Sequence, residues 1–168
     1  MPALRPDSRF LLAHPAHFVA LGFGSGLSPI APGTAGTLWA WLAYAVMQRW
    51  LGVAAIGGVI LVSLLVGQWA CTVAAERMGI ADPGSIVWDE VVAFWLVLWL
   101  VMPAGFAMQL AAFILFRFFD AVKPGPVRWA DRLFHGAQGW RNGFGILLDD
   151  LAAAFCTLLV IAAWRFFA

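Results

Sequence analysis

Residues 51–75, LGVAAIGGVILVSLLVGQWACTVAA, form the longest clearly apolar run of the chain, with only three polar residues and no charged side chain. About 20 apolar residues are enough for an α-helix to cross the hydrocarbon core of a bilayer. The whole chain has this character, since 63% of its 168 residues are hydrophobic and only 11% are charged. Soluble domains average about 45–50% apolar and about 25% charged residues. The sequence therefore predicts an integral membrane protein.

Further apolar segments lie on both sides of this stretch, at residues 34–48, 86–102, 104–122 and from 146 to the end. The segment 34–48 is short for a span, and Pro103 and Gly105 interrupt the chain between the next two. The expected fold is an all-α bundle of about four to five transmembrane helices. We expect one domain over residues 1–168, with an interfacial N-terminal segment at 1–17 and a cytoplasmic loop at 123–145.

The basic residues orient this bundle. With five spans and the N-terminus inside, only Arg49 and Arg165 fall outside, and cytoplasmic loops are the ones that carry excess Lys and Arg. The basic residues placed inside are Arg5, Arg9, Arg77, Arg117, Lys123, Arg128, Arg132 and Arg141. The net charge of +1 argues against a large basic surface for nucleic acid. Cys71 and Cys156 lie in apolar runs without metal-ligand spacing, so we expect them to be packing residues.

Most of the acidic residues fall on the same, cytoplasmic side. Asp89 and Glu90 open an apolar segment, where carboxylates also stabilise a helix N-terminus. Adjacent helical residues point about 100° apart, so we expect that these two cannot both face one ligand head-on. Asp149 and Asp150 lie inside an apolar segment, where ionisable groups are costly and usually face a partner or a water-filled cavity. Two such pairs facing one another would form an oxygen-rich site suited to Mg²⁺.

The stretch FRFFDAVKPGPVRWADR, residues 116–132, combines basic and acidic side chains at a helix end. Arg117, Asp120 and Lys123 are three residues apart and can share a face before Pro124 ends the helix. One interpretation is phosphate binding by the basic residues of this stretch; the other is contact with anionic lipid headgroups under the positive-inside rule. The candidate phosphate-binding residues here are Arg117, Lys123, Arg128 and Arg132.

A glycine-rich stretch, FGSGLSPIAPGTAGT at residues 23–37, precedes the first apolar segment. Backbone N–H groups of such turns, with hydroxyl side chains, can cradle a phosphate at a helix N-terminus. The nucleotide P-loop pattern is missing, because no Gly-Lys-Ser/Thr ending follows. The alternative is a re-entrant or interfacial loop whose small residues permit close helix packing. The candidate phosphate-binding residues are Ser28, Thr34, Gly36 and Thr37.

Four motifs occur in one order: GFGSGLSPIAPGTAGTLWA, DPGSIVWDE, FRFFDAVKPGPVRWADR with HG, and GILLDDLAAA. Together they resemble the phosphatidylglycerophosphatase A family of bacterial membrane phosphatases, over about residues 18–154. The resemblance implies Mg²⁺-dependent hydrolysis of phosphatidylglycerophosphate to phosphatidylglycerol and phosphate at the cytoplasmic face of the inner membrane. The chain departs from the family pattern by an insertion after His135, which weakens any assignment of that residue.

The expected mechanism is metal-assisted phosphomonoester hydrolysis, with either water or a carboxylate as the nucleophile. The predicted catalytic residues are Asp89, Glu90, Asp120, Asp149 and Asp150, of which all but Asp120 are predicted Mg²⁺ ligands. A small transporter or channel component with a buried carboxylate site is the alternative, although the middles of the spans are bare of polar groups. A phosphatidyltransferase is disfavoured because its paired-aspartate motif is absent.

Overall fold

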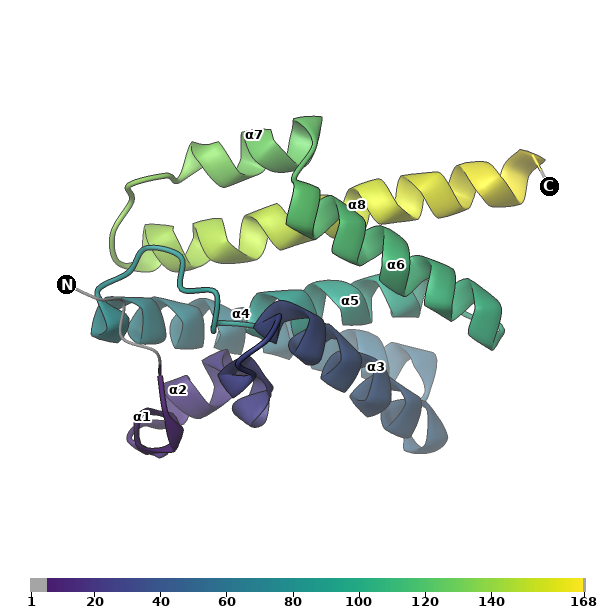
Figure 1. Ribbon diagram of the computed structural model, residues 1–168. Coiled ribbons are helices and arrows are strands. Elements are labelled where there is room, and N and C mark those ends of the chain that lie inside the picture. The colour runs from purple at the N-terminus through teal and green to yellow at the C-terminus, as the bar shows by residue number, and fades with distance from the viewer. Residues whose placement is uncertain (1–5, 168) are drawn as a thin grey trace.

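The computed structural model describes residues 6–167, and across them every regular element is a helix (Figure 1). Residues 1–5 of the expected interfacial segment, including Arg5, lie outside the described residues. In chain order the elements are α1 (Ser8–Leu12), α2 (Pro15–Ala20), the 3₁₀ helix η1 (Gly22–Leu27), α3 (Pro32–Trp50), α4 (Val53–Met78), α5 (Trp88–Val101), α6 (Phe106–Val122), α7 (Gly125–Leu133) and α8 (Trp140–Phe167).

Two helices, α4 and α8, are long and apolar enough to cross a membrane. Their 26 and 28 residues correspond to about 39–42 Å at about 1.5 Å per residue. Helices α3, α5 and α6 have 19, 14 and 17 residues and cover the other predicted apolar segments. The all-helical class is thus confirmed, together with two helices of spanning length.

Helix α5 forms the centre of the bundle and contacts α3, α4, α6 and α8. Its sequence is apolar on every side after the first turn, because every face meets another helix. Phe94, Val97 and Leu98 are among its fully buried residues. Its first turn, with Asp89 and Glu90, is therefore held rigidly inside the molecule.

Tryptophan side chains fasten α5 to its neighbours. The indole N–H of Trp88 donates to Ser63 O of α4 at 3.0 Å, and that of Trp95 donates to Ala40 O of α3 at 2.8 Å. Gly67 of α4 makes room for the first of these rings, since a Cβ on it would lie 2.6 Å from Trp88. A buried indole needs a hydrogen-bond partner for its N–H. Each bond therefore fixes the position of α5 along the neighbouring helix as well as the distance between the two helices.

The polar segment 123–145, expected as a loop, is largely helical. It contains α7, and α8 begins at Trp140, six residues before the predicted apolar segment. Lys123 turns the chain between α6 and α7 with φ +47°, a left-handed conformation that non-glycine residues seldom adopt. In Figure 1, α7 lies alongside the first half of α8, and the C-terminus lies at the opposite end of the bundle. The glycine-rich stretch forms η1, a short connection and the first turn of α3.

Candidate active site

Three carboxylates, those of Asp89, Glu90 and Asp150, come together where α5 begins. Each offers an oxygen that lies within 4.8 Å of an oxygen of the other two. The residues are 8%, 9% and 3% exposed, so all three charges are withdrawn from water. Charges buried without compensation are costly, and such groups are normally paired or bound to a metal. We call these three residues the acidic cluster.

The two helices that carry the acidic cluster are fixed independently. The backbone of α5 is anchored just before its first turn, where Val87 N donates to Ala20 O at 2.9 Å. Asp150 lies well inside α8, which packs along α5. Asp89 and Glu90 point about 100° apart around α5, yet an oxygen of each reaches the acidic cluster. The Glu90 side chain is one methylene longer, so it can return its carboxylate to the position that Asp89 reaches directly.

Each member of the acidic cluster keeps one buried oxygen without a hydrogen-bond partner among the described residues. These atoms are Asp89 Oδ1, Glu90 Oε2 and Asp150 Oδ2, and Asp149 Oδ1 is a fourth. Buried polar atoms are nearly always satisfied, so a group of unsatisfied carboxylate oxygens needs an explanation. Carboxylate oxygens are the ligands preferred by hard divalent cations such as Mg²⁺. The donor set therefore fits such a cation.

Arg117 joins α6 to the acidic cluster. Its guanidinium lies 2.5 Å from Asp120 Oδ2, one helical turn away, and 3.5 Å from Glu90 Oε1. The same Nη1 lies 3.4 Å from the hydroxyl of Thr37, which itself donates to Gly33 O at 2.8 Å. The first turns of α3 thus reach the cluster through Thr37 and Arg117. Gly33 permits this approach, because a Cβ there would lie 2.2 Å from Glu90 Oε1.

Asp149 lies beside the acidic cluster and is paired differently. Its Oδ2 accepts a hydrogen bond from Lys123, whose Nζ also donates to Asp131 Oδ1 at 2.7 Å. Burial disfavours the charged ammonium, but the two carboxylates outweigh this and raise the pKa of Lys123 above its ordinary value. The two ion pairs of Lys123, at the end of α6, therefore link it to α7 and α8 next to the cluster.

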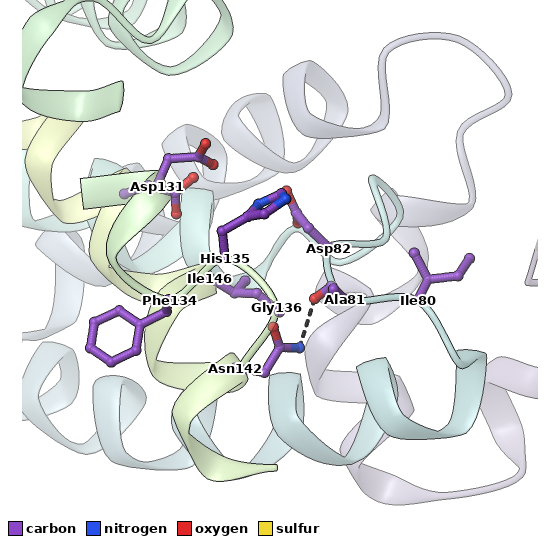
Figure 2. A pocket seen from close by; sticks show the side chains of 11 residues that line it. Ile80, Ala81, Asp82, Asp131, Phe134, His135, Gly136, Asn142 and Ile146 are labelled. Atoms are coloured by element: carbon purple, nitrogen blue, oxygen red, sulfur yellow. Dashed lines mark hydrogen bonds between the residues drawn. The ribbon is translucent and has the colours of Figure 1, made fainter. Parts of the chain in front are cut away.

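A cavity of about 390 Å³ lies next to the ion pairs of Lys123 with Asp149 and Asp131, between the α4–α5 connection, α7 and α8 (Figure 2). Asp149 lines it together with Asp82, Asp131, His135 and Asn142. Figure 2 shows the His135 ring and the Asp82 side chain pointing toward one another, and Asn142 donates to Ala81 O at 2.7 Å. His135, which precedes the insertion, therefore lines the same cavity as Asp149.

Two residues in direct contact with predicted charged groups of the site were absent from the predicted set: Asp131, which pairs with Lys123, and Gly33, which lies against Glu90. Asp131 was recognisable only as an acid on the same side as the others, because its bond to Lys123 depends on α7, which was not predicted. Gly33 belonged to the quoted glycine-rich stretch, but nothing in the sequence distinguished it from the neighbouring glycines.

The remaining predicted residues lie as follows. Thr34 is half-buried in the first turn of α3, beside Gly33. Gly36 faces Val87, and a Cβ on it would lie 2.7 Å from that side chain, so its small size serves helix packing. The Ser28 hydroxyl donates to Ile30 O at 2.7 Å within the connection before α3. Arg128 and Arg132 are exposed on α7 and form no ion pair with any described residue.

Comparison with known proteins identifies a family for this chain and three curated relatives. Residues 18–165 match the family model described as phosphatidylglycerophosphatase A. A phosphatidylglycerophosphatase A of Escherichia coli is 39% identical over 146 residues, which cover 87% of this chain and 81% of that one. The protein of the same name from Haemophilus influenzae is 38% identical over 161 residues, covering 96% and 95%. The third relative, from Bacteroides thetaiotaomicron, is named a putative phosphatidylinositol-3-phosphatase and is 34% identical over 154 residues, which cover 88% of this chain and 91% of that one. No solved structure matches the chain.

Proposed function

The chain belongs to the phosphatidylglycerophosphatase A family, and from this premise we propose that it hydrolyses phosphatidylglycerophosphate to phosphatidylglycerol and phosphate with a Mg²⁺ ion held by the acidic cluster. The observation that carries the proposal is the convergence of Asp89, Glu90 and Asp150, each with an unpartnered buried oxygen. A phosphatase of this kind needs a charge-stabilising centre for the phosphoryl group, and these residues supply its ligands.

The charge balance supports a bound cation. Five buried carboxylates gather at this end of the bundle, and two cations, Arg117 and Lys123, are paired with them, which leaves a formal charge of −3. The five acids are Asp89, Glu90, Asp120, Asp149 and Asp150. Such a site would repel a phosphate dianion. A divalent cation at the acidic cluster removes most of this repulsion.

When bound, Mg²⁺ would polarise the phosphoryl oxygens and lower the pKa of a coordinated water. The chain's own residues perform the remaining tasks. Asp89, Glu90 and Asp150 would supply the ligands from two helices that packing holds still. Arg117 is oriented by Asp120 and Thr37, so its remaining N–H groups are preorganised for a phosphate oxygen.

Further basic and hydroxyl groups surround this centre. We propose that Lys123, anchored by Asp149, adds a second positive charge beside the acidic cluster. Arg128 and Arg132 are exposed on α7, where they would attract the anionic lipid before it reaches the cluster. Thr34 follows Gly33 in the first turn of α3, and its hydroxyl and the nearby backbone N–H groups would donate to the phosphate.

We also propose that α3, α4, α5, α6 and α8 are embedded in the bacterial inner membrane, with the acidic cluster on the cytoplasmic side. Positively charged side chains are concentrated at this end, whereas Arg49 and Arg165 lie near the ends of α3 and α8 that are remote from it. Helix α5 is only 14 residues long, about 21 Å, so it cannot span the roughly 30 Å hydrocarbon core alone. Its first turn would lie below the membrane surface, at a depth where a lipid headgroup can bend to meet it.

The direct test is phosphate release by the purified protein in detergent. We expect release from phosphatidylglycerophosphate in the presence of Mg²⁺, little release when EDTA removes the ion, and slower release from phosphatidic acid. Release that is unchanged by EDTA would contradict the metal assignment, and no release from phosphatidylglycerophosphate at any Mg²⁺ concentration would contradict the function. A transporter or channel component would give the second outcome.

A further inference from the structure

We propose that a groove between α3 and α6 holds an acyl chain of the lipid substrate while its phosphate is at the acidic cluster; this inference rests on the proposed function. The groove has a volume of about 380 Å³. Four residues of α3 and two of α6 line it: Leu38, Trp41, Leu42, Ala45, Phe106 and Gln109.

The groove is formed by the same two helices that bring Thr37 and Arg117 to the cluster. Its first lining residue, Leu38, directly follows Thr37 along α3. On α6, Phe106 is eleven residues before Arg117, which is about 16 Å along the helix at about 1.5 Å per residue. On α3 the groove therefore begins beside the site, whereas on α6 its nearest lining residue, Gln109, is eight residues before Arg117, about 12 Å along the helix. An acyl chain attached to a headgroup at the cluster would have to follow a path of this kind.

The floor of the groove offers no free polar group. Trp41 Nε1 donates to Gln109 Oε1 at 2.8 Å, and Gln109 Nε2 donates to Ala104 O at 2.9 Å. The Trp41 ring stacks on Phe106 and on Phe113, with 5.6 Å between centroids in each pair. Because the polar atoms already bond to one another, the surface presented is hydrocarbon and aromatic. This surface suits the methylene groups of an acyl chain and would bind water or a polar ligand poorly.

The walls of the groove are open to the surroundings. Leu42 and Phe106 are 66% and 71% exposed, and Leu38 is half-exposed. A lipid in the bilayer can thus enter sideways, with its headgroup at the level of Thr37 and its chain between the two helices. The cluster then needs no tunnel, because the substrate never leaves the membrane.

A second apolar cavity, of about 260 Å³, lies between α6 and α8 and provides an internal comparison. Ala107, Met108 and Leu115 of α6 line it, with Val160 and Trp164 of α8 among the residues opposite. On α8 it begins ten residues beyond Asp150, about 15 Å along the helix. On α6, however, Leu115 lies two residues before Arg117, so only the α8 side of this cavity is remote from the site. We assign the chain to the α3–α6 groove because its lining residue Leu38 directly follows Thr37, which contacts Arg117.

The kinetic test fills each cavity from an exposed alanine, so that neither substitution disturbs the core. Ala45→Phe fills the α3–α6 groove, and Ala107→Phe, on α6, is the matched control in the other cavity. We expect Ala45→Phe to lower kcat/KM for dioleoyl phosphatidylglycerophosphate about tenfold, the effect of displacing about two buried methylene groups. The dihexanoyl substrate, whose chains are too short to fill the groove, should be cleaved within about twofold of the wild-type rate.

Ala107→Phe should act on both substrates as the wild type does. If Ala45→Phe leaves both chain lengths unaffected, or slows both equally, the groove does not hold the chain. If Ala107→Phe shows the chain-length effect instead, the α6–α8 cavity is the site and the proposal is overturned.

A second measurement decides the matter without catalysis. A phosphatidylglycerophosphate analogue with a diazirine in one acyl chain is irradiated with the protein in detergent micelles containing excess ordinary phospholipid. We expect labelled peptides from residues 38–45 and 106–109. Labelling spread evenly over the outer helix faces, or labelling concentrated on the residues of the α6–α8 cavity, would overturn the proposal. Because no turnover is required, this result separates failure of the groove from failure of the proposed function.

Discussion

The backbone of Gly33 lies directly against the carboxylate of Glu90, since a Cβ on Gly33 would be 2.2 Å from Glu90 Oε1. It would also be 2.9 Å from a guanidinium nitrogen of Arg117. Both are the far ends of flexible side chains, so an added methyl group would displace the carboxylate and the guanidinium rather than the helices. The glycine therefore controls the position of two charged groups of the site and contributes little to the stability of the bundle.

We accordingly predict that Gly33→Ala lowers kcat by at least about tenfold while the protein remains folded, because a small misplacement of catalytic groups is costly. The measurement is phosphate release at saturating Mg²⁺, with thermal unfolding in detergent as the check on folding. Gly58→Ala is the control, because nothing lies within 4 Å of a Cβ built at that position of α4. Full activity in Gly33→Ala would show that Glu90 does not need its present position.

Removing one oxygen ligand from the acidic cluster should change the response to Mg²⁺. We expect Asp150→Asn to reduce turnover by more than about a hundredfold at low Mg²⁺, because even outer partners of a metal site cost about 10–100-fold when lost. Part of this loss should be recovered at high Mg²⁺. The control is Asp7→Asn, whose side chain caps α1 far from the cluster in sequence. A Mg²⁺ titration that superimposes on that of the wild type would remove Asp150 from the ligand set.

The ion pair between Lys123 and Asp149 should be visible as a coupling in stability. The side chains are 26% and 9% exposed, so Lys123→Met leaves a largely buried carboxylate without its cation. We expect a loss of about 3 kcal/mol in the free energy of unfolding. The double variant with Asp149→Asn should lose less than the two single variants together. Asp131→Asn, at a carboxylate 34% exposed, should cost under about 1 kcal/mol. Strictly additive losses would mean that the pair contributes nothing.

The helical core was predictable because long apolar runs bounded by Gly and Pro indicate membrane helices. Helix α4 begins at Val53 and ends at Met78, close to the predicted segment 51–75. Helix α7 was missed because its nine residues lie in a stretch whose Pro and Gly content favours a loop, although its charged and apolar side chains follow a helical period. Its existence depends on burying Val127 and Ala130 against the rest of the bundle, and a tertiary contact of this kind leaves little trace in local composition.

The residues of the candidate site could be selected from the sequence, but their arrangement in space could not. Carboxylates inside apolar segments stand out because burial is costly, and this singled out Asp149 and Asp150 as a pair. The structure separates their roles, with Asp150 in the acidic cluster and Asp149 bonded to Lys123. That division depends on the rotation of α8 against α5 and on the left-handed turn at Lys123. Neither is encoded in a spacing that can be read along the chain.

The hydroxyl of Thr37 should matter more for orienting Arg117 than for its own contact with phosphate. Thr37 is fully buried, donates to Gly33 O and lies 3.4 Å from Arg117. We expect the nearly isosteric Thr37→Val to cost about 1 kcal/mol of stability and about tenfold in kcat/KM. Thr34→Val should leave stability unchanged and lower kcat/KM, because it removes the hydroxyl that we propose donates to the phosphate. Both activities are compared at equal protein abundance. A fully active Thr37→Val would leave the bond to Arg117 without a role.

The end of the bundle that carries the acidic cluster should face the cytoplasm. In a version of the protein with Cys71 and Cys156 replaced by alanine, single cysteines are introduced at Ser28, Ser85 and Gly139, which lie in three different connections at this end. An impermeant thiol reagent should label none of them in intact cells and all of them after lysis.

Gly52, in the exposed α3–α4 connection, provides the opposite control and should be labelled from outside. Helices α3 and α5 both begin at the site and run away from it. Labelling of any of the three positions in intact cells would therefore mean that the bundle has the opposite orientation in the membrane. The basic residues on α7 would then face away from the cytoplasm, against the charge distribution that supports the proposed topology.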